Sequence, residues 1–228
     1  FLSGAGMSGD LFFYPNPLAS HGQHERTPWF SCACCPPNVA RFIAQMGGFM
    51  YGVSEGKVFV NMYAQGAAEV PTAAGKVVLT QTTDYPWSGD VKIVVAPEKP
   101  GPFALMVRIP VWAQGKPMPG GLYRYAGGMK EKPSVKVNGK AVPLAIQMGY
   151  VAVDRAWKKG DVVEVHLPMP IQRVLANEKV KADVGLVAVE RGPLVYCTEW
   201  PDNAGLPSSL VLDDAAPLKA EAKPDLLN

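Results

Sequence analysis

Residues 150–167 read YVAVDRAWKKGDVVEVHL, and this stretch indicates which kind of fold the chain adopts. An apolar run, Tyr150–Val153, leads through the turn Trp157–Asp161 into a second run, Val162–Leu167. In the second run apolar and polar positions alternate, as in a strand with one buried face: Val163, Val165 and Leu167 face one side, Glu164 and His166 the other. The stretch therefore predicts two strands joined by a turn.

Short runs rich in β-branched and aromatic residues recur along the chain, which is typical of strands. They span residues 58–63, 77–82, 91–95, 105–109, 135–142, 186–190 and 194–197. The run 135–142 contains Asn138-Gly139, a strong local signal for a hairpin. The chain also has 22 prolines and 23 glycines, which suit frequent turns. Together these features predict a mainly β protein with a jelly-roll-like β-sandwich, and a second sandwich starting after about residue 170 is an open alternative.

The N-terminal part has a different pattern. Residues 1–35 lack periodicity and predict a long ordered loop over a site. Pro36 and Pro37 then open a helix that Gly52 ends, with apolar residues on one face: Val39, Phe42, Ile43, Met46 and Met50. We expect residues 1–52 to be part of a larger helical unit, 53–200 to form the β region and 201–228 a loosely packed tail. The start at Phe1, without an initiator Met, reads as a piece of a longer protein.

Composition excludes several classes of protein. Hydrophobic residues make up 48% of the chain and charged residues 18%, which fits a globular protein rather than a disordered one. The net charge of +2 includes no basic block, so nothing indicates binding to nucleic acid or to an anionic membrane surface. No apolar run approaches the length of a membrane span. The compartment is not readable, and both cytoplasm and periplasm stay open.

The strongest indication of chemistry is the run Cys32-Ala33-Cys34-Cys35-Pro36-Pro37-Asn38, which holds three of the four cysteines. Adjacent thiols such as Cys34 and Cys35 rarely reach disulfide geometry. They are better suited to share a soft metal such as zinc, or to provide a nucleophile, and a helix start after them favours the thiolate. A pair of small buried hydrophobic residues is the alternative interpretation. Cys197, within the last apolar run, is expected in the core.

Other candidates lie in the loop before the cysteines. Tyr14 and His24 are predicted to contact a substrate, because aromatic rings and nearby polar groups suit sugars. His21 and His24 could instead complete a zinc site with the cysteines, or simply face solvent. Trp29 and Phe30 suit either sugar stacking or packing against the helical unit. Trp87, Trp112 and Trp157 are expected in the core or in turns. The acidic residues nearest to the cysteines show no pattern that marks a proton donor: Asp10, Glu25, Glu55 and Glu69.

Four stretches carry a resemblance to a known family. They are FFYPNPL at 12–18, WFSCACCPPNVAR at 29–41, WKKGD at 157–161 and ERGPLVY at 190–196. They resemble the β-L-arabinofuranosidase family of zinc-dependent glycoside hydrolases, and the likeness covers nearly the whole chain to about residue 200. The cysteine motif is highly specific, whereas the later stretches indicate the β-sandwich of that family.

The resemblance implies an (α/α)₆ barrel followed by β-sandwich domains, with residues 1–52 as the end of the barrel. It implies that Cys34 is the nucleophile of a retaining mechanism, and that Cys34 and Cys35 are two of four zinc ligands. Cys32 has no direct role in this scheme. The other ligands, a glutamate and a cysteine, and the acid/base glutamate would precede Phe1. We therefore expect a hydrolase that releases β-L-arabinofuranose from arabinose-containing glycans, with this chain alone inactive.

A second hypothesis from the residues belongs to a different class of protein. The chain could be a non-catalytic carbohydrate-binding or scaffolding β-sandwich, in which the cysteines close a purely structural zinc site. Replacement of Cys34 by Ser in the longer protein would separate the two hypotheses. A nucleophile is expected to lose turnover with the fold retained, whereas a structural ligand is expected to lose folded protein first.

Overall fold

The computed structural model describes residues 5–6, 8–14, 23–30, 32, 34–72, 75–199, 203 and 209–223. The chain divides into two compact units. One is Met46–Tyr196, and the other combines Phe1–Gln45 with Cys197–Asn228. The residues at the C-terminal end, predicted as a loose tail, thus belong to the same unit as the N-terminal loop, a pairing across the chain that no local sequence pattern indicates.

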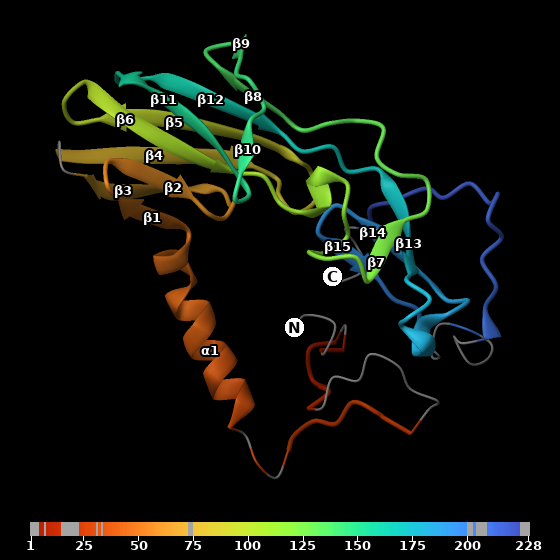
Figure 1. The fold of residues 1–228 in the computed structure, drawn as a ribbon. Coiled ribbons are helices and arrows are strands. Elements are labelled where there is room, and N and C mark those ends of the chain that lie inside the picture. Colours follow the sequence, from red (N-terminus) through yellow and green to blue (C-terminus); the bar gives the residue numbers. More distant parts are fainter. Residues whose placement is uncertain are drawn as a thin grey trace. The chain divides into compact units, whose positions relative to one another are not determined.

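Two sheets form most of the unit Met46–Tyr196 (Figure 1). The six-stranded sheet is antiparallel throughout, in the order β3 (Gly66–Thr72), β4 (Gly75–Thr83), β5 (Asp90–Pro97), β12 (Asp161–His166), β8 (Ser134–Val137) and β9 (Lys140–Ala141). The five-stranded sheet has the order β1 (Tyr51–Ser54), β2 (Lys57–Val60), β6 (Gly101–Arg108), β11 (Tyr150–Trp157) and β10 (Ile146–Gln147). Its β2 and β6 run parallel, which departs from an all-antiparallel jelly roll.

The two sheets share one apolar core, which confirms the predicted sandwich. Leu79 and Ile93 enter it from the six-stranded sheet, and Leu105 from the five-stranded one. The alternation predicted for β12 is also confirmed, because Val163 and Val165 are buried while Glu164 and His166 are exposed. Trp157 is fully buried at the end of β11, and its indole N–H donates to the carbonyl of Phe103 at 2.9 Å.

A third, four-stranded sheet lies in the same unit. Its order is β15 (Leu194–Tyr196), β14 (Val187–Arg191), β13 (Ile171–Ala176) and β7 (Tyr123–Tyr125). The buried side chains of Tyr125 and Val174 in this sheet stand apart from the main core. The expectation that Cys197 is buried was wrong: β15 is an edge strand that ends at Tyr196, and Cys197 is exposed.

The predicted helix is α1 (Cys35–Gln45), and the 3-10 helix η2 (Met46–Phe49) follows it. The expected stop at Gly52 was wrong, because Gly52 lies in β1 and pairs with Phe59. The α-helix ends earlier, just before Gly47-Gly48, where two glycines make continuation costly. Phe42 and Ile43 on α1 are about half exposed, at 49% and 52%. The helical unit to which this helix would belong stays a prediction.

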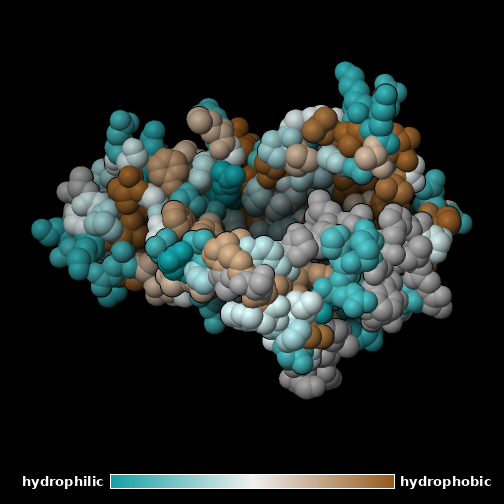
Figure 2. Space-filling view, turned by 90° about the horizontal axis from the view of Figure 1, so that it is seen from below, coloured by the Kyte–Doolittle hydropathy of each residue, from teal (hydrophilic) through white to brown (hydrophobic). Residues whose placement is uncertain are grey.

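Two further 3-10 segments lie in the described part of the chain, η3 (Trp112–Gln114) and η4 (Lys181–Asp183). Within the described residues, no helix is both long and apolar enough to cross a membrane. On the face drawn in Figure 2, apolar side chains reach the surface in several separate places among polar ones. Trp87, expected in the core or a turn, lies in the turn before β5 and is 69% exposed.

Candidate active site at the cysteine pair

Cys34 and Cys35 stand at the N-terminal end of α1, where the sequence predicts them. Cys35 is the first residue of the helix and Cys34 immediately precedes it. Both thiols are exposed, and their Sγ atoms are 3.6 Å apart. The side-chain amide of Asn38 donates to the carbonyl oxygen of Cys34 at 3.0 Å, which ties the turn before the helix to its first residues. The N-terminal end of a helix stabilises negative charge, so the position favours thiolates.

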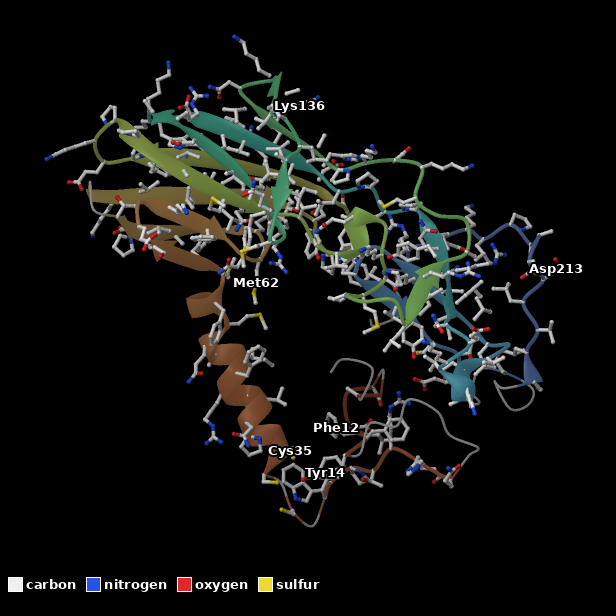
Figure 3. All side chains as sticks on the ribbon, viewed as in Figure 1. Phe12, Tyr14, Cys35, Met62, Lys136 and Asp213 are labelled. Carbon is white, nitrogen blue, oxygen red and sulfur yellow. The ribbon has the colours of Figure 1, made fainter. Side chains whose placement is uncertain are left out.

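Tyr14 contacts both thiols from a loop twenty residues upstream (Figure 3). Its Oη lies 3.2 Å from Cys34 Sγ and 3.1 Å from Cys35 Sγ. Hydrogen bonding to Tyr14, followed by that to Cys35, lowers the pKa of Cys34 below its usual value. The same contacts raise the pKa of Tyr14, so at neutral pH the phenol keeps its proton and can donate a hydrogen bond to the sulfur atoms.

Among the described residues, the loop that holds Tyr14 is connected by backbone hydrogen bonds, ring contacts and an ion pair. Phe12 and Thr27 exchange two backbone hydrogen bonds, each of 2.8 Å. The ring of Phe30 meets that of Tyr14 edge-on, with centroids 4.9 Å apart. Arg26 lies over the ring of Phe13 and also pairs with Glu199 from the C-terminal part of the unit. No sequence pattern predicts this ion pair, because its partners are distant in the chain and neither belongs to a motif.

The structure says less about the roles of the other predicted site residues. Cys32 is exposed, and a hydrogen bond from it contributes to the lowered pKa of Cys34. His24 is half-buried in the loop, and its proposed contact with substrate stays a prediction. Trp29 is 69% exposed and stacks on Phe30 with centroids 6.4 Å apart. His21 lies outside the described residues.

The cysteine pair fits two corners of a zinc site. Thiolates at about 2.3 Å from a tetrahedral zinc lie roughly 3.8 Å from each other, close to the 3.6 Å between the two Sγ atoms. Over the described part of the chain, no group of three or more His, Cys, Asp and Glu side chains is gathered closely enough to hold a metal. The described residues thus offer two sulfur atoms at a spacing that zinc would accept, whereas a complete tetrahedral site would need four ligands.

The chain is similar to β-L-arabinofuranosidases over nearly all its length. Three family models match in succession: the GH127 catalytic domain at residues 1–48, the GH127 middle domain at 57–169 and the glycoside hydrolase family 127 C-terminal domain at 171–225. A non-reducing end β-L-arabinofuranosidase of Bifidobacterium longum subsp. longum is 31% identical over 220 residues, which are 90% of this chain and 30% of that protein.

Solved structures agree with these matches. A GH127 β-arabinofuranosidase aligns with a TM-score of 0.80 and 49% identity over 89% of this chain and 32% of its own. A GH127 β-L-arabinofuranosidase from Geobacillus stearothermophilus T6 aligns with a TM-score of 0.72 and 35% identity over 85% of this chain and 30% of its own. The chain thus spans about a third or less of the length of these relatives. From three successive domain matches and the agreement in fold, the chain belongs to the GH127 β-L-arabinofuranosidase family, with part of the catalytic domain followed by the middle and C-terminal domains.

Proposed function

We propose that this chain supplies the nucleophile of a retaining glycoside hydrolase that releases β-L-arabinofuranose from arabinose-containing glycans. The observation that supports this most is the contact of Tyr14 with Cys34 and Cys35 at the start of α1. It lies in the segment that matches the GH127 catalytic domain. An exposed thiol with a lowered pKa, beside a phenol that keeps its proton, is a suitable nucleophile at neutral pH.

In the proposed first step, the Cys34 thiolate attacks the anomeric carbon of the sugar. The carbon–sulfur bond forms, the bond to the leaving oxygen breaks, and that oxygen takes a proton from a general acid. In the second step water attacks the same carbon, its proton goes to the group that acted as acid, and the thiolate leaves. Two displacements on one carbon retain its configuration.

Cys34 and Cys35 would be the ligands that this chain offers to zinc, and bound zinc would keep both thiols deprotonated. The Tyr14 hydroxyl would donate a hydrogen bond to Cys34 Sγ, and the ring of Phe30 packs edge-on against the ring of Tyr14. No described carboxylate forms a hydrogen bond with either thiol in the structure. We propose that the general acid and the remaining ligands belong to a part of the catalytic domain that this chain does not include, so that the chain alone is inactive.

The test uses the longer protein and an aryl β-L-arabinofuranoside as substrate. Cys34→Ser should abolish turnover while the circular dichroism spectrum stays unchanged, and Cys197→Ser, at another exposed cysteine, is the matched control that should keep most activity. The 228-residue chain should not hydrolyse the substrate. Loss of folded protein in Cys34→Ser before loss of turnover would instead support a structural zinc site. Turnover retained by folded Cys34→Ser would refute the proposal.

A further inference from the structure

The ion pair between Arg26 and Glu199 joins two distant parts of the chain. The guanidinium donates two parallel hydrogen bonds of 2.7 Å, from Nη1 to Oε2 and from Nη2 to Oε1. The partners are 173 residues apart, one in the segment that matches the catalytic domain and the other in the segment that matches the C-terminal domain. The side chains are only 16% and 33% exposed, so water screens the pair less than an ordinary surface pair.

Arg26 is connected to Tyr14 through short contacts. Its neighbour Thr27 forms both backbone hydrogen bonds with Phe12, at 2.8 Å each. Its guanidinium carbon lies 4.6 Å from the centre of the Phe13 ring. Phe13 directly precedes Tyr14, so both contacts hold the backbone just before the residue that reaches the two thiols.

Such contacts matter for this loop because its described residues contribute little buried apolar surface. Leu11, Tyr14 and Trp29 are exposed, and none of the buried apolar side chains lies in the described parts of residues 5–45. The β-bridges among those residues join Phe12 to Ala5 and to Thr27, and the Gly6 N–H also donates to the Leu11 carbonyl at 2.7 Å. A bidentate pair with a planar guanidinium sets both position and direction, which a single backbone bridge does not.

We propose that Glu199 is a positioning residue for the reaction: through its bidentate pair with Arg26 it fixes the loop that places Tyr14 against Cys34 and Cys35. The C-terminal segment thereby contributes to the geometry of the thiol site without touching substrate. This inference rests on the proposed function for its catalytic consequence, although the placement of Tyr14 can be measured without any turnover. The pKa of Glu199 is lowered by its hydrogen bonds with Arg26, so the carboxylate is charged at neutral pH.

The first experiment measures the 228-residue chain after removal of metal by a chelator. Glu199→Gln keeps the shape of the side chain and removes its charge, and Glu69→Gln, which breaks the exposed pair with Lys76 in the other unit, is the matched control. Hydrogen exchange of the Phe12 and Thr27 amides should become faster in Glu199→Gln only. Alkylation of Cys34 by iodoacetamide at pH 7 should slow by about twofold to tenfold, the range that loss of one hydrogen bond produces.

A double variant separates positioning from general loss of structure. In a Tyr14→Phe background, Glu199→Gln should slow alkylation no further, because its effect passes through the phenol. Glu199→Asp should be intermediate, and the charge-reversed pair Arg26→Glu with Glu199→Arg should recover part of the rate. Unchanged hydrogen exchange and alkylation in Glu199→Gln would overturn the inference. It would also be overturned if Glu199→Gln slowed alkylation as much in the Tyr14→Phe background as in the unchanged chain.

In the longer protein, Glu199→Gln should lower kcat by a similar factor and leave KM within about twofold, since the sugar is not touched. A change in KM alone would contradict positioning of the nucleophile. If folded Cys34→Ser retains turnover, the proposed function fails, yet the exchange and alkylation results still decide whether Glu199 places Tyr14. The two failures are therefore distinguishable.

Discussion

At the scale of single residues, the phenol of Tyr14 should control the ionisation of Cys34. A donated hydrogen bond favours the thiolate, so its loss in Tyr14→Phe should raise the pKa of Cys34 toward the usual value for a thiol. At any pH between the two pKa values, less thiolate is present and alkylation is slower. The measurement is the pH profile of Cys34 alkylation with metal removed, which should move to higher pH. Tyr196→Phe, at an exposed tyrosine of β15, is the control, and an unmoved Tyr14→Phe profile would contradict the assignment.

Glu190 is a second residue whose environment predicts a pH effect, this time on stability. It is 7% exposed and accepts a hydrogen bond from Tyr125; burial raises its pKa, and the hydrogen bond only partly opposes this. From about pH 4.5 up to the raised value, the folded chain therefore holds a proton that the unfolded chain has lost. Stability should fall as pH rises through this window, and most of the fall should vanish in Glu190→Gln.

The measurement for Glu190 is the urea midpoint of the 228-residue chain across that window. Glu178→Gln, at an exposed position before η4, is the control, and its urea midpoint should change with pH as in the unchanged chain. If the urea midpoint changes with pH equally in Glu190→Gln and Glu178→Gln, ionisation of Glu190 does not lower the stability of the folded chain.

At the scale of elements, the junction of β5 and β12 depends on a glycine. A Cβ built on Gly89 would lie 1.8 Å from the carbonyl oxygen of Leu167, while the Leu167 N–H donates to the Gly89 carbonyl at 2.9 Å. Gly89→Ala must therefore push the strand ends apart and should cost about 2–3 kcal/mol of unfolding free energy. Gly121→Ala, with no atom within 4 Å, should change it by less than about 0.5 kcal/mol. Denaturant unfolding checks both, and equal midpoints would refute the close contact.

The elements also show what the sequence can predict. Runs rich in β-branched residues located β4 and β5, and alternation located β12. The hairpin predicted at Asn138-Gly139 is present, with φ of 50° and 76° at these two residues. The parallel pairing of β2 with β6 and the antiparallel pairing of β7 with β13 were not predicted. Local patterns report which side of a strand is buried, whereas the choice of partner depends on packing between distant segments.

The candidate site shows the same division. The cysteine doublet before two prolines indicated reactive or metal-binding thiols, because that chemistry is local to the chain. The contact of Tyr14 Oη with two sulfur atoms was not predicted, and the predicted contact of Tyr14 with substrate stays a prediction. The pair of Arg26 with Glu199 had no sequence signal at all. An irregular loop has no period from which side-chain direction can be derived, so its contacts follow only from the fold.

At the scale of the whole molecule, the two compact units should differ in stability. All of the buried apolar residues lie between Val58 and Val174, in the unit Met46–Tyr196, whereas the other unit contributes none among the described residues. Burial of apolar area is the main source of folding free energy, so local opening should cost least where that burial is absent. Amides of β4, β5 and β12 should therefore exchange slowest, and those of residues 8–14 and 209–223 much faster.

Hydrogen exchange in increasing low concentrations of urea tests this difference directly, because global opening depends on denaturant and local opening does not. Leu79→Ala, which empties a fully buried site, should cost about 2–5 kcal/mol. It should speed exchange in β4, β5 and β12 while residues 8–14 keep their rates, since the two units open independently. One common rate for all segments, changed alike by Leu79→Ala, would mean that the chain unfolds as a single cooperative body.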